Sequence, residues 1–198
     1  MPEVISLRLF VALVLPKPLL ARLTETHAQL VAADTTSAVR FVRASDMHLT
    51  LRFLGEVDAP RAHALQTALA GALAGLPAPE LGLAHVGAFP NLRRPRVLWV
   101  GIRGDDAALA AVHTAVTRAL VPLGFAPEER AFQPHLTVGR VRESPRPQLL
   151  GGALQKLLET MPPDTGPAAP ASEVVLFRSH LGSGPPRYER LATFALGV

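Results

Sequence analysis

The sequence predicts an α+β fold of two pseudo-symmetric lobes, with antiparallel sheets lining a central cleft and helices packed outside. Strand-like segments occur in pairs joined by short connections, which favours antiparallel ladders, and helix-like segments separate the pairs. The tripeptide His-Leu-Thr also occurs twice, 87 residues apart, each time where a strand is expected to begin. We therefore expect residues 1–198 to form a single domain made of two interleaved lobes, with the two tripeptides meeting across a cleft.

The N-terminal elements are predicted from local patterns. Residues 6–15 alternate and are rich in Leu, Phe and Val, as in a buried strand that ends before Pro16. Residues 19–33 carry leucines at helical spacing. Residues 39–43 and 48–54 are expected to form two short strands with a turn between them.

The middle of the chain continues with a helix and a pair of strands. The helix is expected over residues 58–76, with Asp58 as its N-cap and Pro60 in its first turn. The strands are expected over residues 81–89 and 97–102, separated by a loop rich in Pro and Arg.

The last part of the chain alternates helices and strands. We expect a helix capped by Asp105 or Asp106, then a strand, a second helix and a closing strand pair, over residues 105–120, 136–141, 147–161, 173–181 and 188–196.

The composition excludes several classes of protein. Cysteine is absent, so disulfides, a Cys nucleophile and Cys-based metal sites are ruled out. The apolar run at residues 9–15 is too short for a membrane span and lacks the features of a signal peptide. A cytoplasmic protein that does not bind a membrane is expected. The formal charge of +4 comes almost entirely from arginine, which suits phosphate but is also typical of a GC-rich genome.

The repeated tripeptide places polar groups in pairs. On a strand, alternate side chains share a face, so His48 projects with Thr50, and His135 projects with Thr137. If the two strands lie side by side, two imidazoles and two hydroxyls converge on a space about the size of a phosphate. A single His-x-Thr is usually a structural feature, but fewer than one copy is expected by chance in this composition and two are present.

Two histidines can divide the work of acid–base catalysis. The ordinary pKa of histidine, about 6.5, lets one imidazole accept a proton from water while the other gives a proton to a leaving oxygen. The threonine hydroxyls could donate hydrogen bonds to phosphate oxygens as negative charge develops. No metal and no cofactor are expected, because neither tripeptide lies near a set of further ligands at chelating spacing.

Segments around and beyond the two tripeptides resemble the two-histidine (2H) phosphoesterase superfamily, and within it the RNA 2′,3′-cyclic phosphodiesterases, historically called 2′-5′ RNA ligases. The resemblance covers nearly the whole chain. It lies in Arg8-Leu9-Phe10-Val11-Ala12-Leu13, His48-Leu49-Thr50-Leu51-Arg52-Phe53-Leu54-Gly55, Gly87-Ala88-Phe89-Pro90, Val97-Leu98-Trp99-Val100-Gly101, Phe132-Gln133-Pro134-His135-Leu136-Thr137-Val138-Gly139-Arg140, Leu176-Phe177-Arg178-Ser179 and Pro186-Arg187-Tyr188-Glu189.

This resemblance implies a bilobed fold with an open cleft and the hydrolysis of a terminal 2′,3′-cyclic phosphate of RNA to a 2′-phosphate, with weak joining of RNA ends. It also implies His48 as proton donor to the departing 3′ oxygen and His135 as the base that activates water. An exchange of these two roles stays open, since the two half-units are similar.

Five further residues are candidates for substrate binding. Arg52 shares the face of His48 if its strand is regular, whereas Arg140 would share the face of His135 only if Gly139 marks a bulge. Phe41, Arg43 and Phe132 could stack on a base, although burial in the core is the commoner role of such phenylalanines. The cluster Arg93-Arg94-Pro95-Arg96 is a candidate contact for the RNA backbone.

Two alternatives remain open at this point. The substrate could be a small cyclic phosphate, derived from a nucleoside or from ADP-ribose, in which case the arginine cluster would be dispensable. The chain could instead bind RNA ends without catalysis. The expected partner is RNA with a 2′,3′-cyclic phosphate end, tRNA fragments included, and a monomer is expected.

Overall fold

The computed structural model describes residues 6–143, 150–180 and 187–197 and confirms the α+β class. Its strands are β1 (Ser6–Leu13), β2 (Val39–Phe41), β3 (Leu49–Asp58), β4 (Glu80–Phe89), β5 (Val97–Gly104), β6 (His135–Val141), β7 (Ala169–Pro170), β8 (Glu173–His180) and β9 (Arg187–Ala195). Its helices are α1 (Lys17–Ala33), α2 (Arg61–Leu73), α3 (Asp106–Leu120) and α4 (Gly152–Thr160), with short 3-10 turns η1 (Ala44–Asp46) and η2 (Val121–Leu123).

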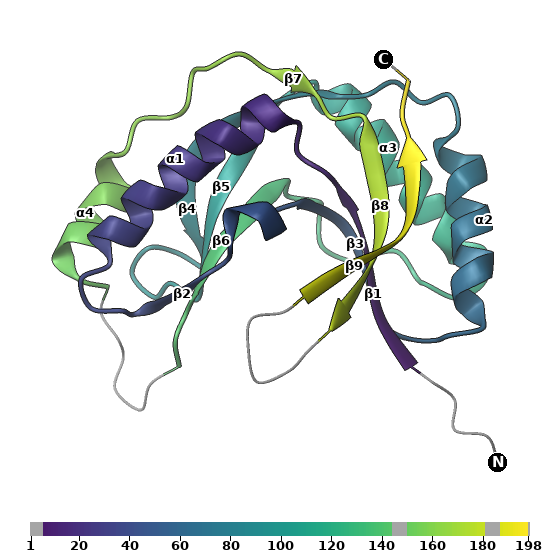
Figure 1. Ribbon diagram of the computed structural model, residues 1–198, viewed down its shortest axis with the longest axis horizontal. Helices are drawn as coiled ribbons and strands as arrows, with labels where there is room; N and C mark the ends of the chain where they lie inside the picture. Colours follow the sequence, from purple (N-terminus) through teal and green to yellow (C-terminus); the bar gives the residue numbers. More distant parts are fainter. Residues whose placement is uncertain (1–5, 144–149, 181–186, 198) are drawn as a thin grey trace.

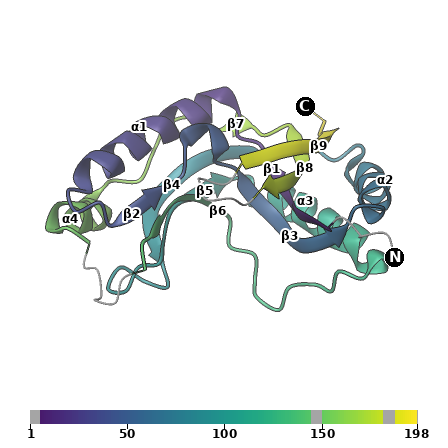
Figure 2. The same ribbon diagram turned by 60° about the horizontal axis from the view of Figure 1, so that its bottom comes forward.

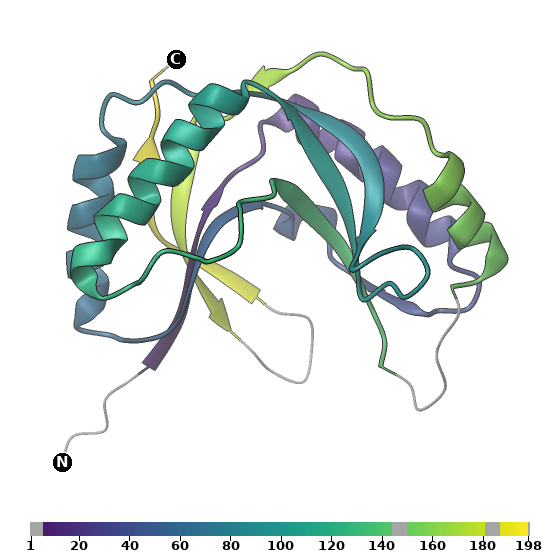
Figure 3. The same cartoon turned by 180° about the vertical axis from the view of Figure 1, so that it is seen from behind.

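The strands form one antiparallel sheet in the order β7-β4-β5-β6-β3-β1-β8-β9, with β2 added alongside β6. The sheet curls into an arch, which Figure 2 shows from below. Helices α1 and α4 lie outside the β4–β5–β6 half, and α2 and α3 lie outside the other half (Figures 1 and 3). The helices therefore leave the concave side of the arch open.

The core lies between the sheet and these helices. Helix α1 buries Leu19, Leu23 and Leu30, and α2 buries Leu65, Leu69 and Leu73, at the spacing of three to four residues, or multiples of it, that forms one apolar face. Burial of leucine is worth about 1.5–3 kcal/mol per side chain, so this face is the main source of stability for each helix. No helix within the described residues has the length and hydropathy needed to cross a membrane.

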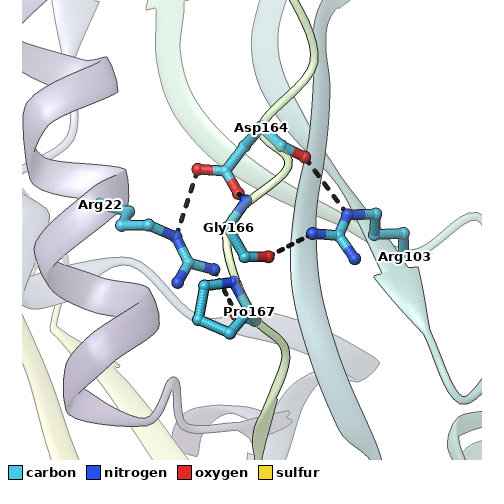
Figure 4. Close-up of polar contacts among 5 residues, drawn as sticks. All are labelled: Arg22, Arg103, Asp164, Gly166 and Pro167. Atoms are coloured by element: carbon cyan, nitrogen blue, oxygen red, sulfur yellow. Dashed lines mark hydrogen bonds and ion pairs between the residues drawn. The ribbon is translucent and has the colours of Figure 1, made fainter.

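A polar network ties the segment between α4 and β7 to two other elements (Figure 4). Arg22 of α1 lies with Nε 3.2 Å from Asp164 Oδ2 and donates from Nη2 to the Pro167 carbonyl at 2.8 Å. Arg103 of β5 donates to the carbonyls of Asp164 and Gly166 from the other side. The segment is thus held between a helix and a strand that are far apart in sequence.

Three local predictions differ from the structure. Strand β3 continues to Asp58, which pairs with Ser6 of β1, so Asp58 does not cap α2 and Pro60 takes the N-cap position. The segments 39–43 and 48–54 do not pair with each other, because β2 pairs with β6 instead. Helix α4 begins only at Gly152. The expected helix start at residues 147–149 lies outside the described residues, as does residue 181 of the expected strand 173–181.

Candidate functional site

The two His-Leu-Thr tripeptides meet at the centre of the sheet. Strands β3 and β6 are paired antiparallel at Leu49 and Leu136, which are the middle residues of the two tripeptides. Both leucines are fully buried, so they anchor the tripeptides from behind. An antiparallel count from this pair sets His48 opposite Thr137 and Thr50 opposite His135.

Bulges break the regular alternation just beyond each threonine. The pairing of β1 with β3 shifts register between Val11 and Ala12, which leaves Leu51 without a partner in β1. The pairing of β5 with β6 shifts in the same way and leaves Val138 without a partner in β5. Leu51 and Val138 occupy the same place in their respective repeats, so the two bulges are equivalent. A bulge reverses the faces of the residues that follow it.

The bulges decide which side chains join the cleft. Phe53 and Arg140 are equivalent residues, each three positions after its threonine, and both line two grooves that lie beside the paired tripeptides and are described below. Arg140 was expected there only if a bulge occurred at Gly139, and the bulge lies at the preceding residue. Arg52 was expected to share the face of His48 if β3 were regular. The bulge at Leu51 makes β3 irregular, so Arg52 does not share that face.

The Arg52 guanidinium is engaged elsewhere. Its side chain is buried, donates to the carbonyl of Ala126 and lies with Nη1 3.2 Å from Glu128 Oε1. Arg52 reaches the edge of one groove but its charge is paired with the loop between η2 and β6. In the structure this arginine holds that loop against β3.

Both histidines are oriented by the same kind of hydrogen bond. His48 Nδ1 lies 2.8 Å from the Asp46 carbonyl oxygen, and His135 Nδ1 lies 2.7 Å from the Gln133 carbonyl oxygen. A carbonyl only accepts, so each Nδ1 carries the hydrogen. When either ring is neutral, its Nε2 therefore holds a lone pair and can accept a proton.

The surroundings of the two rings differ. His48 stacks on Phe10 with ring centroids 4.7 Å apart, lies 5.8 Å from the Phe177 ring and meets the edge of Tyr188 at 5.2 Å. Burial in this aromatic cage lowers the pKa of His48, against the opposing effect of the Asp46 carbonyl and carboxylate. His135 meets the Phe89 ring at 5.0 Å. The two imidazoles are thus related by the repeat but sit in unlike environments.

Tyr188 adds a hydroxyl to the cage around His48. Burial, together with the nearby Asp46 carboxylate, raises the pKa of the Tyr188 phenol. The phenol therefore stays protonated at neutral pH and remains able to donate a hydrogen bond.

Two grooves leave the centre, one beside each histidine. The His48 groove, of about 580 Å³, is lined by aromatic residues such as Phe10, Phe41 and Tyr188. The His135 groove, of about 860 Å³, is lined by Phe89 and Phe132 and by several arginines. Thr50, Phe53, Thr137 and Arg140 line both grooves, so they mark the junction between them.

The other predicted binding residues are distributed over these grooves. Phe41 packs edge-on against His27 and lines the His48 groove, and Phe132 stacks on His113 at 4.1 Å and lines the His135 groove. Both are partly buried against the core as well. Arg43 lines the His48 groove, but its Nε is 2.7 Å from Asp46 Oδ2. That ion pair fixes the η1 turn whose Asp46 carbonyl orients His48.

Only part of the arginine cluster at residues 93–96 lines a groove. Arg94 and Arg96 line the His135 groove, whereas Arg93 lines neither groove. No group of three or more His, Asp or Glu residues suited to a metal ion occurs among residues 6–143, 150–180 and 187–197.

Phe53, Phe10, Tyr188 and Arg130 line the grooves and were not singled out from the sequence as site residues. Phe53 could have been found from the repeat alone, because it stands 87 residues before Arg140. Phe10 and Tyr188 lie in distant strands that pairing with β8 brings together, so no local pattern marks them.

Comparison with known proteins gives one consistent result. The family model described as LigT like Phosphoesterase matches residues 13–99 and 101–188. A protein of Methanothermobacter thermautotrophicus named RNA 2′,3′-cyclic phosphodiesterase is 30% identical over 191 residues, covering 96% of this chain and 100% of the relative. One of the same name from Aeropyrum pernix is 37% identical over 110 residues, which are 56% of this chain and 61% of that relative's length.

A solved structure has the same fold over its full length. Escherichia coli LigT complexed with 3′-AMP superposes with a TM-score of 0.73 at 27% identity, covering 97% of this chain and 99% of that one.

Proposed function

The chain belongs to the LigT-like phosphoesterase family, and from this premise we propose that it hydrolyses 2′,3′-cyclic phosphate ends of RNA to 2′-phosphates. The observation that carries the proposal is the pairing of Leu49 with Leu136, which faces the two His-Leu-Thr tripeptides across one spot. Relatives named RNA 2′,3′-cyclic phosphodiesterase support the substrate. The 3′-AMP complex of E. coli LigT supports a ribose phosphate as a ligand.

The proposed reaction is an in-line displacement at phosphorus. A water oxygen attacks the cyclic phosphate, its proton passes to neutral His135, and the bond from phosphorus to the 3′ oxygen breaks. His48 gives its proton to that departing oxygen, and the phosphate stays on the 2′ oxygen. Paired placement of an acid and a base of this kind typically contributes about 10²–10⁴ in rate for each group.

The charge state that His48 needs as a proton donor depends on the substrate. His48 must carry a proton to act as donor, and its burial lowers its pKa and opposes that state in the free protein. A bound phosphate anion beside the ring favours the protonated form again. Donation by His48 is therefore coupled to the presence of substrate.

The threonines and Arg140 complete the proposed phosphate site. Thr50 and Thr137 would donate to the non-bridging oxygens, where negative charge develops in the transition state. Arg140 lines the junction of the grooves and would contact the same anion. Arg43, Phe41 and Phe132 are proposed as outer contacts to the nucleotide, and Arg52 as support for the adjoining loop.

The same centre would also join RNA ends weakly. A 5′-hydroxyl in place of water would give a 2′-5′ bond by the identical displacement. Hydrolysis dominates in dilute solution unless the second end is held in place. Action as a single-domain monomer in the cytoplasm, on ends such as those of tRNA fragments, is part of this proposal.

A product analysis tests the proposal. Purified protein is incubated with a short RNA ending in a 2′,3′-cyclic phosphate in excess EDTA, and the terminal phosphate is identified. The expected product is a 2′-phosphate, formed at the same rate with and without EDTA. A 3′-phosphate would contradict the proposed leaving group, and loss of turnover in EDTA would contradict metal-free catalysis. Binding without turnover would favour a non-catalytic RNA-end module.

A further inference from the structure

The His135 groove collects arginines from two separate loops. Arg94 and Arg96 come from the loop between β4 and β5, and Arg130 comes from the loop between η2 and β6. All three side chains are exposed. Arg140 stands where this groove meets the catalytic centre. Three further guanidinium groups therefore share the groove that opens beside the proposed phosphate site.

These charges are not neutralised by neighbouring carboxylates. Within the described ranges, Arg94, Arg96 and Arg130 take part in none of the ion pairs, whereas the groove's carboxylate Glu128 is paired with Arg52. In the His48 groove the situation is different. There Arg8 lies 3.9 Å from Glu56, and Arg43 is paired with Asp46. Among the described residues, Arg40, which also lines the His48 groove, takes part in none of these ion pairs, so unpaired guanidinium groups occur in both grooves and are more numerous in the His135 groove.

The groove also offers surfaces for bases. Phe89 and Phe132 line it, and Phe53 at its inner end is 60% exposed, which is unusual for so large an apolar side chain. Aromatic rings in a cationic groove are the features by which proteins hold single-stranded nucleic acids without reading their sequence. The arginine fork suits the phosphodiester oxygens of such a strand.

A cyclic mononucleotide would leave most of this surface unused. Its single phosphate is bound at the histidines, and it has no further anion to offer to Arg94, Arg96 or Arg130. An oligonucleotide offers one phosphate per residue upstream of its cyclic end. The groove is also the larger of the two, at about 860 Å³.

We propose that the His135 groove holds the single strand upstream of the cyclic phosphate, and that Arg94, Arg96 and Arg130 make the enzyme prefer oligonucleotides to mononucleotides. This rests on the proposed function and adds where the rest of the substrate lies. The arginines bind the strand through its phosphates, so the preference depends on length and ionic strength and little on sequence.

The test compares two substrates in two matched variants. One variant carries Arg94→Gln, Arg96→Gln and Arg130→Gln. The control carries Lys17→Gln, Arg118→Gln and Lys156→Gln, which removes the same charge from exposed positions outside both grooves. kcat/KM is measured for a short RNA with a 2′,3′-cyclic phosphate end and for a nucleoside 2′,3′-cyclic phosphate, over a range of salt concentrations.

We expect the groove variant to lose at least about tenfold on the RNA while keeping its rate on the nucleoside cyclic phosphate. The slope of log kcat/KM against log salt for the RNA should become shallower by about 2, since each phosphate contact to a single strand contributes about 0.7. The control should match the wild type on both substrates. Retained turnover of the nucleoside cyclic phosphate also establishes that the variant is folded.

Other outcomes overturn the proposal. Equal losses on both substrates would place these arginines at the catalytic phosphate, and no loss on the RNA would leave them without a role in binding. A wild-type protein inactive on both substrates would instead refute the proposed function itself.

Discussion

Replacement of His48 or His135 by alanine should lower kcat/KM for a cyclic phosphate end by about 10²–10⁴. Each change removes one of the two proton-transfer groups and leaves the backbone of the paired strands in place, because Leu49 and Leu136 carry the contact between β3 and β6. Rates are measured with RNA bearing a 2′,3′-cyclic phosphate, at saturating and limiting substrate. A variant that keeps a tenth or more of the wild-type rate would remove that histidine from the mechanism.

Two controls separate chemistry from folding. His48→Gln keeps most of the volume that the cage of Phe10, Phe177 and Tyr188 encloses, yet it should be as slow as His48→Ala. The double variant His48→Ala/His135→Ala should be slower than either single variant, but by less than the product of the two single losses, because the losses of groups that act on one displacement are not additive. Additive losses would indicate two independent roles.

Loss of either threonine hydroxyl should have the next largest effect. Thr50→Val and Thr137→Val keep the branched shape that suits a strand and remove only the donor. If each hydroxyl stabilises charge that develops in the transition state, kcat should fall by about 10²–10³ for each change, with KM little altered. Single-turnover and steady-state kinetics on the cyclic phosphate RNA measure both constants.

Serine provides the matched variant for each threonine. Thr50→Ser and Thr137→Ser retain the hydroxyl and should retain most of the rate. A rise in KM with kcat unchanged in the valine variants would mean that the hydroxyls only bind the ground-state phosphate. Equal losses in the serine and valine variants would point to packing around the methyl group.

Much of the fold could be predicted because its elements follow local periodicity. The strand at 6–15 and the helix at 19–33 are visible in the spacing of their apolar residues, and Asp105 caps α3 by accepting a hydrogen bond from the Ala108 amide. Local patterns do not identify which strand each strand pairs with. Asp58 looks like a cap until Ser6 is placed opposite it, and β2 joins β6 from across the chain.

In the candidate site, too, the features set by local sequence could be predicted and those set by strand pairing could not. The repeat predicts that His48 and His135 share a centre with their threonines, and the structure brings these four residues together. The residues beyond the threonines could not be assigned, because a bulge depends on register with a neighbouring strand. With the bulge at Leu51, Phe53 lines both grooves, whereas Arg52 lines only the His135 groove. Catalysis by the four residues stays a prediction.

If one histidine gives a proton while the other takes one, kcat/KM must depend on the protonation of both rings, and its pH dependence is the decisive measurement. The kcat/KM of the wild-type protein should have a bell-shaped dependence on pH, since His135 must be neutral and His48 protonated. Residual activity of His48→Ala should rise with pH and level off. Residual activity of His135→Ala should fall as pH rises through the pKa of His48, which burial holds below its ordinary value.

If His48→Ala instead lost activity with rising pH and His135→Ala gained it, the roles of proton donor and proton acceptor would be reversed, and paired catalysis would still hold. A wild-type rate that rises steadily from about pH 5 to about pH 9 would contradict paired acid–base catalysis by these histidines, because a required protonated imidazole loses its proton within that range.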